Sequence, residues 1–116
     1  LGELREKPGM DAIISSKYTN FIEGSFEGKA KMLRENYSSF DFVWFDCGGA
    51  AEYETFMHEY WDICTGYIFF HFTYSLGRPN NLHDIILKNL TGNPAIFDIV
   101  EPHKSRQGSI TMVRKY

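Results

Sequence analysis

The stretch Phe40–Gly49, FDFVWFDCGG, decides the fold of this chain. It is an apolar run from Phe40 to Phe45 with a single aspartate in it, and it changes abruptly to Asp46, Cys47 and two glycines. A continuous apolar run is typical of a strand that is buried on both faces of a parallel sheet. Ligands of open α/β sheets bind at the carboxyl ends of such strands. The stretch therefore predicts a buried strand with Asp46 at the edge of a binding site.

The segment after Gly49 has helical periodicity. Its large apolar residues recur at steps of three and one, which places them on one face of a helix: Tyr53, Phe56, Met57, Tyr60, Trp61 and Cys64. The dipeptide Thr65-Gly66 is expected to end this helix. The aromatic run Tyr67–Thr73 that follows, broken only by His71, predicts the next buried strand.

The remaining segments continue the alternation of strands and helices. The expected elements are a strand at Tyr18–Glu23, a helix at Gly28–Tyr37, a helix capped by Asn80 or Asn81 with Leu82, Ile85, Ile86 and Leu90 on its apolar face, and strands at Ala95–Val100 and Ser109–Arg114. No element is assigned to residues 1–17. Alternating strands and helices imply a mostly parallel sheet with flanking helices. The last two strands have no helix between them, so they should form an antiparallel hairpin.

Length and composition narrow the class of protein. The chain has 116 residues, which suits a single domain, and 43% of them are hydrophobic. A formal net charge of −3 argues against a nucleic-acid partner, which requires clustered basic residues. No apolar run is long enough to span a bilayer, so no membrane association is expected. The two cysteines, Cys47 and Cys64, fit free thiols in a reducing, cytoplasmic compartment.

The order of these segments resembles the C-terminal half of a class I S-adenosylmethionine-dependent methyltransferase. In that family the third strand ends in a phrase similar to Phe21–Ser25, and the fourth strand ends like Val43–Asp46. A helix with a Tyr and a Trp follows, then a fifth strand, a helix and a terminal hairpin that ends in basic residues like Arg114-Lys115. The resemblance covers the chain from about Thr19 onward and implies a partial Rossmann-like domain.

Two elements of the family have no counterpart in this sequence. They are the glycine-rich turn after the first strand, which approaches the methionine portion of the cofactor, and the acidic residue after the second strand. Those two strands lie between the third and the fourth in the family's sheet, so the strand at Tyr18–Glu23 would lack its neighbour. The chain is then part of a longer polypeptide, or that strand closes onto Phe40–Phe45, or another chain covers the edge. We expect the first, because Leu1 is an unusual natural start.

Two residues are candidates for catalysis. By the resemblance, Asp46 lies near the methionine group of the cofactor and the substrate, and in catechol-type members the matching carboxylate helps to bind a divalent metal. His71 interrupts an aromatic strand near its end, and its titration near neutral pH suits a general base that takes a proton from an acceptor hydroxyl. The competing interpretations are that Asp46 caps the following helix or the turn and that His71 is a hydrogen-bonded structural histidine.

The resemblance also assigns the cofactor contacts. Gly24, Ser25 and Phe26 match the place where the family contacts the adenine, and Asp46 and Cys47 match the edge of the fourth strand that faces the cofactor. A small residue lets the backbone approach, a polar one bonds the ring and an aromatic one stacks on it. An ordinary turn between a strand and a helix is the alternative explanation for the first three.

Other polar groups give weaker indications. Tyr74, Ser75 and Arg78 follow the strand with His71, where substrate contacts would fall, and His103, Lys104 and Arg106 form a basic cluster in the last hairpin. A zinc site can be assembled from Cys47, His58, Cys64, His71 and His83, but their spacing fits no ligand signature, so no metal site is predicted.

These observations predict methyl transfer from S-adenosylmethionine to an oxygen of a small molecule, by a chain that is part of a longer protein and inactive alone. A homo-oligomer or association with the missing half of the domain is compatible with this expectation. The alternative is a non-enzymatic module that binds a partner or dimerises through an open sheet edge. A hydrolase that uses Asp46 and His71 is a third reading, but the sequence has no G-x-S-x-G nucleophile elbow.

Overall fold

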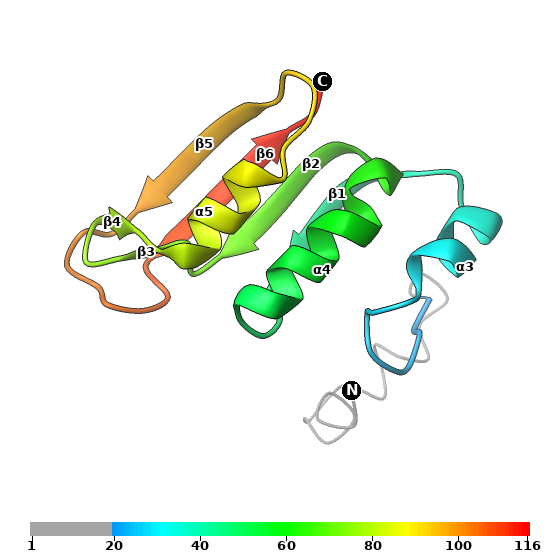
Figure 1. Ribbon diagram of the computed structural model, residues 1–116, viewed down its shortest axis with the longest axis horizontal. Coiled ribbons are helices and arrows are strands. Elements are labelled where there is room, and N and C mark those ends of the chain that lie inside the picture. The colour runs from blue at the N-terminus through cyan, green and yellow to red at the C-terminus, as the bar shows by residue number, and fades with distance from the viewer. Residues whose placement is uncertain (1–19) are drawn as a thin grey trace.

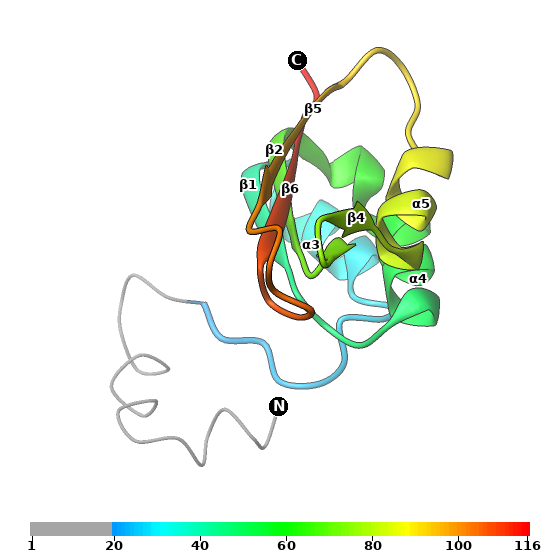
Figure 2. The same cartoon turned by 90° about the vertical axis from the view of Figure 1, so that its left-hand side faces the viewer.

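A computed structural model describes residues 20–116 as an α/β unit in which helices cover one face of a mixed sheet (Figures 1 and 2). Residues 1–17 and the first part of the expected strand Tyr18–Glu23 lie outside the described residues. The elements are α3 (Ala30–Asn36), β1 (Phe40–Phe45), α4 (Ala50–Tyr60), a 3-10 turn (Trp61–Ile63), β2 (Cys64–His71), β3 (Tyr74–Ser75), β4 (Arg78–Pro79), α5 (Asn81–Lys88), β5 (Ala95–Val100) and β6 (Ser109–Arg114).

The larger sheet has the strand order β1-β2-β6-β5. Strands β1 and β2 are parallel and are joined through α4, whereas β6 pairs antiparallel with both β2 and β5. The α/β class and the C-terminal antiparallel hairpin are therefore confirmed. The sheet of the described residues is mixed rather than mostly parallel, because β6 lies between β2 and β5 and runs against both.

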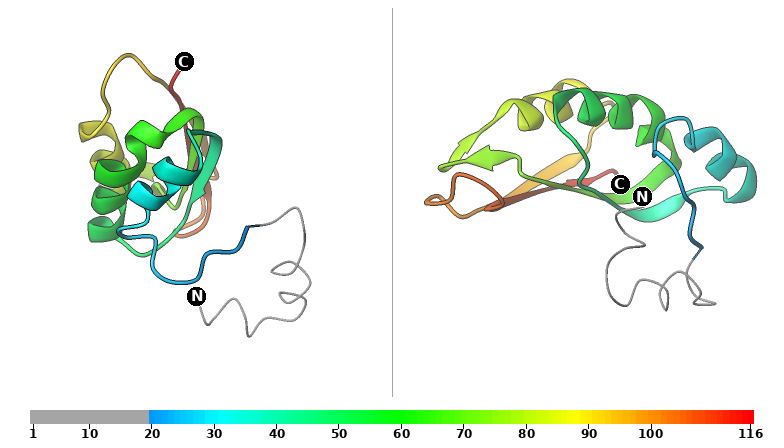
Figure 3. Two further views of the ribbon diagram at one scale, coloured as in Figure 1. Left: turned by 90° about the vertical axis from the view of Figure 1, so that its right-hand side faces the viewer. Right: turned by 90° about the horizontal axis from the view of Figure 1, so that it is seen from below.

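The core lies between this sheet and the pair of helices α4 and α5 (Figure 3). Four members of the predicted helical stripe, Tyr53, Phe56, Met57 and Tyr60, lie on α4 and are buried. The other two, Trp61 and Cys64, are also buried but lie in the 3-10 turn and at the start of β2, so the helix ends earlier than predicted. In β2 and β6 alternate residues are buried, which is the pattern of strands with one covered face. Ile68 and Val113 pair across these two strands and are fully buried.

No helix of the described residues covers the opposite face of the sheet (Figure 2). Phe42 and Trp44 of β1 are 60% and 48% exposed, and Phe97 and Ile99 of β5 are 44% and 68% exposed. Contiguous exposed apolar surface of this kind marks an interaction site more often than a free surface.

Two expected boundaries are wrong. Residues Asn20–Glu23 belong to neither sheet, because the chain here runs along a groove instead of pairing with a strand. Thr65-Gly66 does not end a helix but lies inside β2, which begins at Cys64. In the register of β1 and β2, Asp41 alone lies opposite these two residues, so the strands form a bulge there. Residue 66 must be a glycine because the Asp41 backbone occupies the space that a β-carbon would need.

A short hairpin, β3–β4, was not expected from the sequence and leads into α5. Its turn residues Leu76 and Gly77 both have positive φ angles, 49° and 78°, which is the geometry of a tight hairpin turn. Asn80 follows and is the predicted cap of α5, because its side-chain oxygen accepts hydrogen bonds from the amides of Leu82 and His83.

Candidate functional site

Asp46 and His71 meet at the carboxyl ends of two parallel strands. The register pairs Phe45 with Phe70, so the residues that follow them are neighbours. His71 Nδ1 lies 3.2 Å from Asp46 Oδ2. The His71 side chain is 21% exposed and the Asp46 side chain is 46% exposed, so a ligand can reach both.

The strand end that carries His71 is held by a buried phenol. The Tyr53 hydroxyl donates a hydrogen bond of 2.8 Å to the backbone carbonyl of His71. Burial raises the pKa of Tyr53, and the negative charges of Asp46 and Cys47 raise it further, so the phenol remains a donor. A proton on His71 Nδ1 satisfies the Asp46 carboxylate and leaves the lone pair of Nε2 available. The arrangement can therefore act as a general base.

Asp46 is not the cap of α4. Helix α4 begins after Gly49, whose amide donates a 2.7 Å hydrogen bond to the carboxylate of Glu52 in the first turn. The same carboxylate occupies the space beside Gly48, which has a φ of 71°. Because Glu52 caps the helix, the Asp46 carboxylate is available to His71, and the capping interpretation of Asp46 is wrong.

A groove of about 950 Å³ runs from this strand end to the segment before α3. All five residues expected to contact a cofactor line it, namely Gly24, Ser25, Phe26, Asp46 and Cys47. Its walls are mostly apolar and include Ile22, Leu33 and Trp44. The chain thus brings together two segments that lie about twenty residues apart in the sequence. A volume of this size is in the range of small-molecule sites.

The residues Gly24–Phe26 are held in different ways. Gly24 has a φ of 121°, and a β-carbon there would lie 3.1 Å from Lys29 Nζ. The ammonium group of Lys29 therefore lies next to Gly24, and the sequence had not indicated this residue as part of the site. The Ser25 hydroxyl accepts a hydrogen bond from the Glu27 amide. The Phe26 ring packs edge-on against Phe45 at 5.0 Å, so it is a part of the groove wall rather than a free stacking platform.

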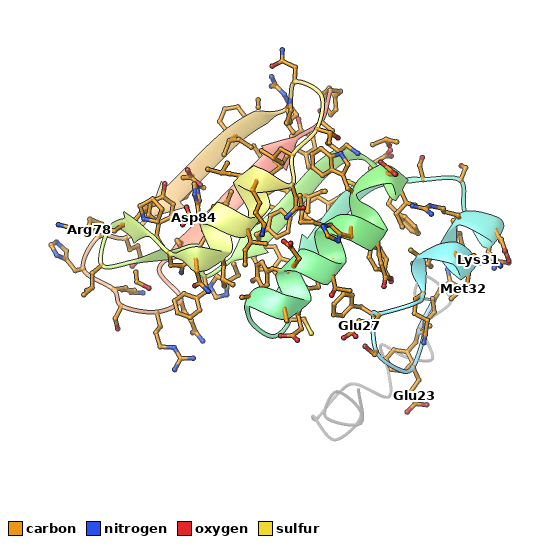
Figure 4. The ribbon with its side chains drawn as sticks, in the orientation of Figure 1. Glu23, Glu27, Lys31, Met32, Arg78 and Asp84 are labelled. Atoms are coloured by element: carbon orange, nitrogen blue, oxygen red, sulfur yellow. The ribbon has the colours of Figure 1, made fainter. Side chains whose placement is uncertain are left out.

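The other candidates lie away from this groove. Tyr74, Ser75 and Arg78 belong to the hairpin β3–β4, and Arg78 is at the opposite end of the molecule from Glu27 (Figure 4). In the basic cluster Lys104 pairs with Glu101 at 3.0 Å, and Arg106 lies over the Phe72 ring. Within residues 20–116, no group of three or more His, Cys, Asp or Glu side chains could hold a metal ion.

A second polar cluster lies under α5 and was missed in the sequence. The Asp98 carboxylate accepts hydrogen bonds from the hydroxyls of Tyr74 at 2.9 Å and Thr111 at 2.6 Å, and it lies 3.2 Å from His83 Nε2. Burial and the Asp98 carboxylate raise the pKa of Tyr74. These residues come from four different elements, so no single segment shows the cluster. The one signal in the sequence is that Asp98 and Thr111 alternate with apolar residues in their strands.

No protein-family model, curated protein or solved structure matches this chain. Among the helices of residues 20–116, none has the length and apolar character needed to cross a membrane.

Proposed function

We propose that this chain contributes to an S-adenosylmethionine-dependent methyltransferase that acts on an oxygen of a small molecule, as part of a longer polypeptide. One observation carries the proposal. The groove gathers the residues to which the resemblance assigns cofactor contacts. One of them, Asp46, lies 3.2 Å from His71, which is not itself among the residues that line the groove. The order of elements from β1 to β6 also supports it, since it follows the order implied by the resemblance.

The groove fits such a cofactor in part. Apolar walls suit the adenine and ribose carbons. The space beside Gly24 holds Lys29 Nζ, so a ligand there would meet this ammonium group together with the Gly24 backbone. The carboxylate of Asp46 suits the positively charged methionine portion. The glycine-rich turn expected at that portion has no counterpart in the sequence. We therefore expect weak binding by these residues on their own.

His71 supplies the base. S-adenosylmethionine, when bound, provides an electrophilic methyl group. His71 Nε2 takes the proton of the acceptor hydroxyl, whose oxygen thereby becomes the nucleophile. Asp46 holds the imidazole by Nδ1 and stabilises the positive charge that the ring gains. The rest of the catalytic effect comes from alignment of the acceptor with the methyl group in the groove.

The proposal is tested by titrating S-adenosylhomocysteine into ¹⁵N-labelled protein of residues 1–116 and following the amide resonances by NMR. At about 5 mM ligand, a millimolar site is mostly occupied. The amides of Gly24–Phe26, Asp46 and Cys47 should shift, whereas those of Asp98 and Thr111 should not. The absence of shifts, or shifts confined to other residues, would contradict the proposal.

A matched pair of variants locates the site. Gly24 and Gly28 both have positive φ angles, 121° and 77°, so an alanine meets backbone strain at either position. Only Gly24 lines the groove. Gly24→Ala should weaken the response to S-adenosylhomocysteine several-fold, and Gly28→Ala should leave it unchanged. Calorimetry on the unchanged chain adds a second check, because micromolar affinity would show that the site is complete without a glycine-rich turn.

A further inference from the structure

Phe72, the residue directly after His71, has a backbone conformation that bulky residues avoid. Its φ is 59°, in the left-handed region, and β2 ends one residue earlier at His71. A large side chain in this region is an outlier, and such strain persists only where the surrounding contacts hold it. A relaxed Phe72 would let the strand continue, so that His71 would no longer be its last residue. The contacts that hold Phe72 therefore decide where the strand that carries His71 ends.

Ser109 makes most of the contacts that hold the chain at this point. Its hydroxyl oxygen accepts hydrogen bonds from the amide of Thr73 at 3.0 Å and from the amide of Tyr74 at 2.9 Å. Its backbone carbonyl accepts a third hydrogen bond from the Phe72 amide at 3.4 Å. The Asn80 side chain donates to the Phe72 carbonyl at 2.8 Å. Since Ser109 is only 4% exposed, bulk water does not compete for its hydroxyl.

A chain of hydroxyl groups connects Ser109 to the Asp98 carboxylate. Thr73 Oγ1 lies 3.5 Å from Ser109 Oγ and 2.6 Å from Thr111 Oγ1. Thr111 Oγ1 in turn lies 2.6 Å from Asp98 Oδ1, and both threonines are fully buried. A carboxylate only accepts hydrogen bonds, and each hydroxyl has one proton to donate. The proton of Thr111 therefore goes to Asp98, that of Thr73 goes to Thr111, and that of Ser109 goes to Thr73.

This direction explains how one hydroxyl can serve two amides. A hydroxyl oxygen has two acceptor lone pairs, and because Ser109 donates its own proton to Thr73, both lone pairs are available to the amides of Thr73 and Tyr74. The Asp98 carboxylate fixes the direction and is itself held, since it also accepts the Tyr74 hydroxyl at 2.9 Å and lies 3.2 Å from His83 Nε2. The polar cluster under α5 is thus joined to the end of β2.

We propose that Ser109 is a positioning residue for His71, and that the hydroxyl chain from Asp98 orients it. Ser109 holds Phe72 in its left-handed conformation, so His71 stays the last residue of β2. There its carbonyl accepts the Tyr53 hydroxyl and its ring contacts the Asp46 carboxylate. The inference rests on the proposed function for the role of His71 as a base. The contact between His71 and Asp46 can be measured without a cofactor, so either proposal can fail while the other stands.

The ring ¹⁵N resonances of the four histidines test the proposal in the full chain above neutral pH. In the unchanged protein, His71 should be protonated mainly at Nδ1, as its contact with Asp46 requires. Ser109→Ala should raise the share of the Nε2-protonated form at least about threefold, because two buried amides lose their acceptor and the strained residue after His71 relaxes. His58 is the internal control, since its ring contacts a different part of the chain and should keep its tautomer ratio.

Two further variants separate positioning from a general loss of stability. Thr111→Val keeps the shape of the side chain but removes the acceptor of the Thr73 hydroxyl. The Thr73 proton then turns to Ser109 and takes a lone pair from the amides, so the His71 tautomers should shift in the same direction. Phe72→Gly removes the strain, because glycine adopts positive φ about as readily as negative φ. In the Phe72→Gly background, Ser109→Ala should have at most about half of its effect on His71.

The outcomes that overturn the proposal are specific. It is wrong if folded Ser109→Ala or Thr111→Val protein keeps the His71 tautomer ratio of the unchanged chain, or if His58 responds as strongly as His71. It is also wrong if Ser109→Ala has the same effect with and without Phe72→Gly. If Ser109→Ala does not fold, Thr111→Val decides by the same criteria. Titration with S-adenosylhomocysteine is separate, because a negative result there contradicts the proposed function and leaves the result for His71 unchanged.

Discussion

Replacing Gly66 by alanine tests the contact that sets the register of β1 and β2. A β-carbon at Gly66 would lie 3.0 Å from the carbonyl carbon of Asp41 and closer still to its oxygen. Favourable contacts between carbon atoms lie at about 3.5–4.0 Å. The oxygen is the limiting contact, because ordinary carbon–oxygen contacts lie at about 3.3–3.6 Å. The strands would therefore have to separate by roughly 1 Å at this point. Since the obstacle is backbone in a paired strand, no side-chain rotation can relieve it.

The expected cost follows from two opposing terms. Overpacking of a well-packed region costs about 1–3 kcal/mol, and a backbone obstacle favours the upper end. The lower conformational entropy of unfolded alanine returns about 0.4–1 kcal/mol. The net destabilisation is about 2 kcal/mol. For a domain of this size, that lowers the melting temperature by roughly 10 °C.

Thermal unfolding followed by circular dichroism measures the effect, with Gly49→Ala as the matched control. Gly49 has a φ of −124°, and a β-carbon there meets no atom within 4 Å. The control should change the stability by no more than about 1 kcal/mol, the cost of alanine at a helix cap. If Gly66→Ala melts within about 3 °C of the unchanged protein, or no lower than the control, the reasoning about this bulge is refuted.

Three further changes test other contacts. Asp46→Asn should shift the neutral His71 ring toward the Nε2-protonated tautomer, seen in its ¹⁵N resonances above neutral pH; unchanged resonances would exclude Asp46 as a positioning residue. A hydrogen bond from the Asn89 amide, and then the contact with Lys88, lower the pKa of Glu54. The stability that this carboxylate contributes is therefore fully present above the ordinary pKa of a glutamate, and it is lost as the pH falls through the lowered pKa. Glu54→Gln should thus melt below the unchanged protein at about pH 7, and the difference should shrink as the pH falls below the ordinary pKa of a glutamate; a difference that stays constant through this range would contradict this sign. Asn80→Ala should cost about 1 kcal/mol in urea unfolding, because two amides of α5 lose their acceptor.

The sequence predicted the elements whose burial pattern is complete within one segment. The apolar stripe of α4 is of this kind. Strands β5 and β6 were predicted as strands, but their covered side was not, because β6 buries Ser109, Thr111 and Val113 rather than the face of Ile110 and Met112. The start of β2 could not be predicted in this way. Thr65-Gly66 resembles a helix terminus locally, and only the backbone of β1 on the neighbouring strand explains why a glycine stands inside β2.

The same distinction holds for the candidate site. Asp46 and His71 could be predicted as neighbours, because each stands at the end of a strand and parallel strands end at one edge. The cluster of Asp98 with His83 could not, since it joins a helix and a strand that the sequence does not show to be neighbours. Lys29 was also out of reach, because its position over Gly24 follows from a turn geometry that the sequence does not specify.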